Sequence, residues 1–184
     1  PYSEGPIERA QLSSTLLNSD ISALSISEYN TNSTTLYVGL TNSGLLRVTE
    51  ASSENPTWAD ISGDFVGSIS DIEIGASEDE IFVSIFNYGV TSLWFTNDGG
   101  ASWNNIEGDL PDIPVKCVLK NPLLSKELII GTMLGIWITE DYTASSPVWV
   151  QAYNGMSETP IWDLDVRKSD NTILATTYGR GFFT

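Results

Sequence analysis

Carboxylates are the only abundant side chains in this sequence that could carry out acid–base chemistry. The 184 residues include 24 acidic residues, eight basic residues and no histidine. Without histidine, the chain has neither a Ser-His-Asp arrangement nor imidazole metal ligands. Asp71 and Asp163 stand at corresponding places in two similar segments, and two carboxyl groups about 5–10 Å apart can hydrolyse a glycosidic bond. They are the candidate catalytic pair, although the interpretation we favour is structural, with each carboxylate accepting hydrogen bonds near its strand.

A second group of polar residues lies in a glycine-rich turn that ends on a tryptophan, Thr96-Asn97-Asp98-Gly99-Gly100-Ala101-Ser102-Trp103. Asp98 can accept hydrogen bonds from backbone N–H groups of the turn, the glycines allow positive φ, and Trp103 can pack beneath as an apolar plug. This combination indicates a structural turn rather than a catalytic or calcium-binding site. Trp58 and Trp149 stand in similar settings, 45 residues before and 46 residues after Trp103.

The tryptophan spacing belongs to a repeat that runs through the chain. Apolar runs begin at Ile21, Ile69, Val115 and Ile161, at intervals of 46 to 48 residues. Each is followed by a second run, a glycine-containing turn and a third run, and the tryptophan lies in a fourth. The runs are rich in β-branched and aromatic residues and lack a helical period. Units of four short strands at this period predict an all-β fold, a β-propeller of four-stranded antiparallel blades.

We expect one propeller domain, or part of one, over residues 1–184, with about four blades. The expected blades are residues 21–62, 69–106, 114–153 and 161–184. The last blade has no fourth run of its own, and residues 1–13, through Pro6 to Leu12, could supply that strand. The ring would then be a closed ring of four blades, a part of a larger ring, or a ring completed by a second copy of the chain.

The turn from Thr96 to Trp103 resembles the Asp-box, or bacterial neuraminidase repeat, found in sialidases, xyloglucanases and sortilin-type receptors. Thr96, Asp98, Gly100, Ser102 and Trp103 match its pattern Ser/Thr-x-Asp-x-Gly-x-Ser/Thr-Trp/Phe. The turns before Trp58 and Trp149 keep only the threonine and the tryptophan. The last residues, Ala175 to Phe183, resemble the final repeat of large secreted bacterial proteins. The resemblance implies a secreted or cell-surface protein in which the box is structural and the ligand binds at the opposite face.

That opposite face consists of the connections into each first run and the turns after each second run. Its carboxylates, amides and flat rings could bind a glycan, by ring stacking and hydroxyl hydrogen bonds, or a peptide. The candidate ligand-binding residues are Asn42, Asn87, Tyr88, Asp109, Asp112, Tyr178 and Arg180. Trp94, Trp137 and Phe182, in the third runs, are expected to pack between blades instead.

Composition narrows the function further. The formal net charge is −16, which disfavours binding to nucleic acid or to an anionic membrane. No apolar segment reaches the roughly 18 residues of a spanning helix, and no metal or cofactor is expected. Four scattered arginines argue against the arginine cluster of a sialidase. We therefore expect a non-catalytic recognition domain of a secreted bacterial protein, binding a glycan or a peptide or protein. The alternatives are a glycoside hydrolase and a structural assembly module.

Overall fold

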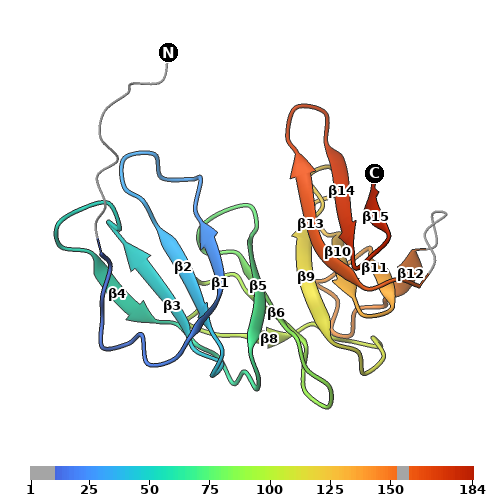
Figure 1. Ribbon diagram of the computed structural model, residues 1–184, viewed down its shortest axis with the longest axis horizontal. Helices are drawn as coiled ribbons and strands as arrows, with labels where there is room; N and C mark the ends of the chain where they lie inside the picture. The colour runs from blue at the N-terminus through green and yellow to red at the C-terminus, as the bar shows by residue number, and fades with distance from the viewer. Residues whose placement is uncertain (1–10, 153–157) are drawn as a thin grey trace.

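All secondary-structure elements of the computed structural model are β-strands, and they form four antiparallel sheets (Figure 1). The structure describes residues 11–152 and 158–184. Within each sheet the strands lie in chain order, so each strand pairs with its neighbours in sequence. We call the sheets blades 1 to 4 and their strands a to d, from the first strand to the last.

Blades 1 and 2 each have four strands. They are β1 (Ile21–Ile26), β2 (Leu36–Leu40), β3 (Leu45–Thr49) and β4 (Thr57–Asp60), then β5 (Ile69–Ile74), β6 (Ile81–Ile85), β7 (Leu93–Thr96) and β8 (Asn104–Asn105). Blade 3 has four strands and blade 4 has three among the described residues. They are β9 (Val115–Lys120), β10 (Leu128–Thr132), β11 (Gly135–Thr139) and β12 (Val150–Ala152), then β13 (Ile161–Arg167), β14 (Thr172–Thr177) and β15 (Gly181–Phe183).

The strand register repeats from blade to blade. In every blade the pairing of strands a and b shifts once, at the start of strand a, as expected of a β-bulge. After the shift, Ala23, Asp71, Cys117 and Asp163 pair with corresponding residues of strand b. This confirms that Asp71 and Asp163 occupy equivalent places in blades 2 and 4.

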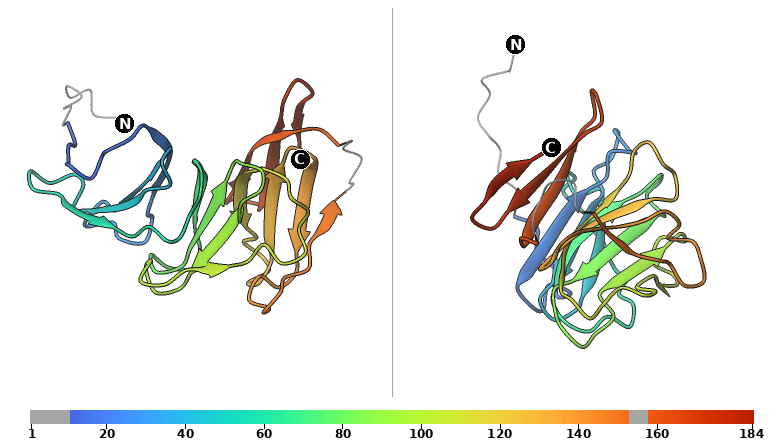
Figure 2. Two further views of the ribbon diagram at one scale, coloured as in Figure 1. Left: turned by 90° about the horizontal axis from the view of Figure 1, so that it is seen from below. Right: turned by 90° about the vertical axis from the view of Figure 1, so that its right-hand side faces the viewer.

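The blades stand side by side in an arc, with blade 1 at one end and blade 4 at the other (Figure 2). Strand a of each blade is innermost and packs against strand a of the next blade. Most of the segment expected to add a strand to blade 4, Pro6 to Ala10, lies outside the described residues. Gln11 and Leu12 lie in no strand, and Leu12 packs against blade 1 instead.

The arc has two loop-bearing faces. The start face is where the a strands begin, and it carries the d-to-a connections and the b-to-c turns. The end face is where the a strands finish, and it carries the a-to-b and c-to-d turns. Each blade also has a forward face, toward the next blade in the chain, and a rear face, toward the preceding one.

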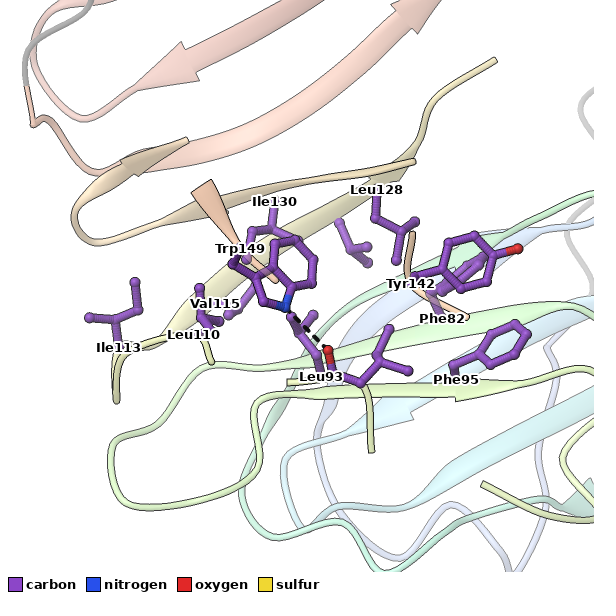
Figure 3. Packing of buried hydrophobic residues seen from close by; sticks show 12 residues of the cluster. Phe82, Leu93, Phe95, Leu110, Ile113, Val115, Leu128, Ile130, Tyr142 and Trp149 are labelled. Carbon is purple, nitrogen blue, oxygen red and sulfur yellow. Dashed lines mark hydrogen bonds between the residues drawn. The ribbon is translucent and has the colours of Figure 1, made fainter. Parts of the chain in front are cut away.

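The apolar core lies between consecutive blades. At the junction of blades 2 and 3, Phe82 and Phe95 of one blade pack with Val118, Ile130 and other residues of the next (Figure 3). The tryptophans of the repeat tie the junctions together through their indole N–H groups. Trp103 donates to the carbonyl of Ile61 at 2.9 Å, and Trp149 donates to the carbonyl of Ile106 at 3.2 Å, in each case in the connection that follows the preceding blade.

The three aromatic residues expected between blades differ in their surroundings. Trp94 and Trp137 pack at the blade 1–2 and blade 2–3 junctions. Phe182 is 74% exposed, so the expectation is wrong for this residue. The pairing explains the difference, because Phe183 pairs with Ala175 as Trp94 pairs with Val83. Phe183 is therefore the counterpart of the tryptophans, and Phe182 points to the forward face.

Candidate functional site

Three aromatic rings and one lysine come together on the start face, and we call Phe86, Lys116, Trp162 and Tyr178 the start-face cluster. Lys116 and Trp162 are the second residues of β9 and β13, while Phe86 and Tyr178 directly follow β6 and β14. In an antiparallel pair, the start of one strand lies beside the end of its partner. The cluster is therefore assembled by the ends of strands from three consecutive blades.

The lysine lies between two of the rings. Its Nζ is 5.1 Å from the ring centroid of Phe86 and 4.7 Å from that of Trp162, both within the range of cation–π attraction. The Trp162 and Tyr178 rings have centroids 5.9 Å apart and planes inclined by 39°. All three rings are exposed. Exposed rings held by neighbours can stack on the apolar face of a sugar or on the side chains of a peptide.

Several predicted ligand-binding residues lie on this face. Tyr178 belongs to the cluster, and Asn87 and Tyr88 form the turn after Phe86. Asp112 supports this turn, because its Oδ1 accepts the N–H of Gly89 at 2.7 Å. A residue of the connection that leads into blade 3 therefore stabilises the turn after β6.

The other predicted residues lie elsewhere on the same side. Asp109 accepts the backbone N–H of Trp149 at 2.7 Å and so holds the last strand of blade 3. Asn42 donates to Asn18 at 2.9 Å and lines a separate hollow of about 280 Å³ on blade 1. Arg180 lies, exposed, in the turn between β14 and β15. The structure therefore brings Asn87, Tyr88, Asp112 and Tyr178 near the cluster but places Asn42 apart from it.

The sequence analysis missed Phe86, Lys116 and Trp162. A signal was present in the repeat, because Lys116 and Trp162 replace Ser22 and Ser70 at the second position of strand a. Likewise, Phe86 and Tyr178 replace Thr41 and Met133 directly after strand b. The second position of strand a and the position after strand b thus meet in space. Blades 2 to 4 contribute the aromatic rings and the lysine at these two positions, and blade 1 has Ser22 and Thr41 there.

Asp71 links blades 2 and 3. Its Oδ1 accepts the N–H of Ile72 at 2.8 Å, and its Oδ2 accepts the N–H of Val118 at 2.9 Å. Burial raises the pKa of Asp71 to about 6, against the lowering effect of these two hydrogen bonds, and the charge of Asp163 raises it further. Glu73 repeats the pattern two residues later: its Oε1 accepts the N–H of Lys120 at 3.0 Å, and burial raises its pKa to about 7.

Asp163 has the same place in blade 4 but a different environment. Its Oδ1 accepts the N–H of Leu164 at 3.0 Å, as Asp71 accepts that of Ile72. The side chain is exposed at the end of the arc, and partial burial raises its pKa. The charge of Asp163 thus contributes to the raised pKa of Asp71, but only Asp71 accepts hydrogen bonds from two blades.

The opposite, end face has a central hollow of about 630 Å³, lined by residues from all four blades. Glu73 and Asp165 lie at the ends of strands a in its wall. Tyr29 donates its hydroxyl to the carbonyl of Gly75. An exposed ion pair between Glu28 and Lys168 joins blades 1 and 4 across this side of the arc. The hollow combines both signs of charge and has no cluster of exposed aromatic rings.

The Thr96–Trp103 turn is held by its own side chains. Asp98 accepts the backbone N–H of Ser102 at 2.9 Å and the hydroxyls of Thr96 and Ser102. These bonds lower the pKa of Asp98 to about 2. Gly99 and Gly100 have φ values of 70° and 91°, which glycine adopts without strain. Asp98 therefore uses both oxygens to close the turn, on the end face and away from the start-face cluster.

Two further findings concern residues 11–152 and 158–184. No group of three or more histidine, cysteine, aspartate or glutamate side chains in this part is arranged to hold a metal ion. No helix there is long and apolar enough to cross a membrane.

The sequence significantly matches no protein-family model and no curated protein. Among solved structures, Raptor from Chaetomium thermophilum is similar with a TM-score of 0.63 and 11% identity, over 85% of this chain and 14% of that chain. The GH74 xyloglucanase from Xanthomonas campestris has a TM-score of 0.59 and 14% identity, over 85% of this chain and 26% of that chain. Sqt1 from Saccharomyces cerevisiae has a TM-score of 0.60 and 10% identity, over 86% of this chain and 43% of that chain. The fold is a β-propeller. This chain spans less than half the length of each of these proteins, and such low identity shows the fold alone.

Proposed function

We propose that this chain is a non-catalytic recognition propeller that binds a glycan through the start-face cluster. The observation that carries the proposal is the set of exposed rings of Phe86, Trp162 and Tyr178, fixed in place by Lys116. Solvent-exposed rings cost free energy unless something covers them, and sugar rings cover them well. A glycan suits this surface better than a charged peptide, because the cluster has a single cation.

The surroundings of the cluster support the same assignment. Asn87 and Tyr88 lie beside it and add an amide and a further exposed ring. Ligand sites of this kind combine apolar faces with a few fixed polar groups. The polar groups would hydrogen-bond hydroxyls at the edge of a sugar whose face stacks on Trp162 or Tyr178.

We further propose that the turn at Thr96–Trp103 is an Asp-box and that the parent protein is secreted by a bacterium. The support is the full match of the turn to the motif and its internally closed hydrogen bonds. GH74 xyloglucanases are among the structures with a similar fold. Plant-type β-glucans, xyloglucan included, are therefore the first ligands to test.

The experiment is calorimetric titration with xyloglucan, cellulose and mannan oligosaccharides. We expect binding by the unaltered chain, and at least a tenfold loss of affinity in Trp162→Ala and Tyr178→Ala, since each stacked ring contributes about 1.4 kcal/mol or more. Tyr29→Ala is the matched control, because it removes an exposed ring from the end face. No binding to any glycan on a broad array, or equal loss in the control, would overturn the proposal.

A glycoside hydrolase is the second candidate, favoured by the equivalent places of Asp71 and Asp163 in blades 2 and 4 and by the raised pKa values of both carboxyl groups. In this function one carboxyl group would be the proton donor and the other the base or nucleophile. Release of reducing sugar from the same oligosaccharides tests it. Release that is abolished in both Asp71→Asn and Asp163→Asn would favour the hydrolase, whereas binding without release favours recognition.

A further inference from the structure

The central hollow of the end face, about 630 Å³ in volume, is large enough to hold a ligand. Most small-ligand pockets measure roughly 300–1,000 Å³. Tyr29, Glu73 and Lys120 line it from blades 1, 2 and 3, so the two junctions involved have both of their blades in the described chain. The start-face cluster lies on the opposite face, and the hollow therefore has no part in the proposed glycan binding.

Glu73 contributes a carboxyl group that the chain uses with only one of its two oxygens. Its Oε1 accepts the backbone N–H of Lys120 at 3.0 Å, and its Oε2 has no donor in the described part of the chain. The side chain is half-buried, and burial raises its pKa to about 7. A carboxylate that is withdrawn from water in this way is stabilised when a cation binds beside it.

Tyr29 contributes an aromatic ring to the same hollow. Its hydroxyl donates to the carbonyl of Gly75, two residues after Glu73, and this bond holds the ring at the end of strand a of blade 2. The residue is still 48% exposed. Burial raises its pKa, and the charges of Glu28, Glu80 and Glu73 raise it further. The ring therefore lies in a negative potential, which favours a cation on its face.

The two lysines of the hollow are engaged by other groups. Lys168 forms an exposed ion pair with Glu28. Lys120 donates its Nζ to the carbonyl of Ser125. Over residues 11–152 and 158–184, neither lysine forms an ion pair with Glu73. The hollow thus presents a carboxylate oxygen and an exposed ring that have no cation of their own.

From these features we infer that the end-face hollow binds an arginine side chain of a partner peptide, with the guanidinium on the Tyr29 ring and beside the Oε2 of Glu73. A guanidinium can stack on a ring and donate from its edge at the same time, whereas an ammonium has no flat face. Ile74, Leu119 and Leu123 also line the hollow and can cover the methylene stem. The formal net charge of −16 favours the approach of a basic segment.

An NMR titration of the chain with the blocked peptide acetyl-Gly-Arg-Gly-amide tests the inference. The amide signal of Lys120, whose N–H donates to Glu73, should shift and saturate with a dissociation constant of about 0.1–1 mM. The citrulline analogue keeps the shape of arginine without its charge and should bind roughly tenfold more weakly. The matched lysine peptide should also bind more weakly, because its ammonium lacks the planar fork.

Two substitutions should change the affinity for the arginine peptide in opposite directions. Glu73→Gln keeps an oxygen for the N–H of Lys120 but removes the charge, and should weaken binding about tenfold. Lys168→Gln removes a positive charge that lowers the pKa of Glu73, and should strengthen binding about threefold. Glu140→Gln and Lys126→Gln are the matched controls, because both residues are exposed and lie outside the hollow.

The pH dependence of binding is a readout that a purely structural role of Glu73 would not give. Because this carboxyl group has a pKa of about 7, a cation that binds its ionised form should bind about tenfold more tightly at pH 8 than at pH 6. The charges of Asp71 and Glu28 raise the pKa of Glu73, and that of Lys168 lowers it. Asp71, with a pKa of about 6, ionises in the same range, so Glu73→Gln should reduce the pH dependence rather than abolish it.

Three results would overturn the inference. They are a Lys120 signal that does not shift up to about 10 mM peptide, equal binding of the citrulline peptide, and equal affinities of Glu73→Gln and the unaltered chain. Shifts confined to the start face would also overturn it, since the cation would then bind at the other site. Equal affinities of the lysine and arginine peptides would overturn the choice of a guanidinium.

Discussion

Asp71 and Asp163 are the same residue type at the same repeat position, yet blades 2 and 4 place them in different environments. Asp71 is half-buried and accepts a backbone N–H of its own blade and one of the next. Asp163 is exposed and accepts the N–H that follows it. The second hydrogen bond of Asp71 comes from the neighbouring blade. Asp71 therefore joins blades 2 and 3, whereas Asp163 supports its own strand.

The largest expected effect of a single substitution is the loss of the Asp71 carboxylate. Asp71→Ala leaves the buried N–H of Val118 without an acceptor, and we expect the free energy of unfolding to fall by about 2–4 kcal/mol. Urea unfolding at pH 7 measures this. A loss below about 0.5 kcal/mol would show that Asp71 does not join the blades.

A comparable effect is expected from pH. The pKa values of Asp71 and Glu73 are about 6 and about 7 in the folded chain, above the values near 4 of unfolded carboxyl groups. The folded state therefore holds more protons between about pH 4 and 7, so stability is greatest below this window and is lost as pH rises through it. We expect these two groups to lower the free energy of unfolding by up to roughly 5 kcal/mol between pH 4 and 8.

Urea unfolding of the Asp71→Asn, Glu73→Gln double variant isolates this contribution. The variant should lose most of the pH dependence of the unaltered chain over this range, while Asp163→Asn should keep most of it. Equal slopes in the double variant and the unaltered chain would contradict the assignment to Asp71 and Glu73.

The smallest effect is expected at blade 4. Asp163→Ala should change the free energy of unfolding of the monomer by less than about 0.5 kcal/mol, because the residue is exposed and has one backbone partner. Urea unfolding at pH 7, measured beside Asp71→Ala, sharpens the comparison. A loss equal to that of Asp71→Ala would contradict the difference between the two environments.

The sequence was sufficient to predict the architecture because the repeat is local. Each run of β-branched residues and each glycine turn predicts its own strand or hairpin, and the regular spacing adds them into blades. The same spacing placed Asp71 and Asp163 in corresponding positions before any contact was known. The one misassigned packing residue, Phe182, is adjacent to the correct one, Phe183, because a shift of one residue reverses the face of a strand.

The site was harder to predict, since it depends on contacts between blades. Phe86, Lys116 and Trp162 come from different blades. A comparison of repeats shows that they differ in type from their counterparts, but it does not show that their two positions meet in space. The raised pKa values of Asp71 and Glu73 also depend on contacts between blades, because burial raises them while the N–H groups of Val118 and Lys120 in blade 3 lower them. Candidates such as Tyr178 and Tyr88 could be chosen because they stand in turns of a predictable face.

The leucines ahead of β1 have a consequence for solubility. Leu12, Leu16 and Leu17 pack against the outer strands of blade 1, with Val38 and Leu46. Removal of this segment would expose the apolar side chains of β2 and β3 to water, and a large exposed apolar patch favours aggregation. A strongly acidic protein therefore depends on a short irregular segment, as well as on its charge, to stay in solution.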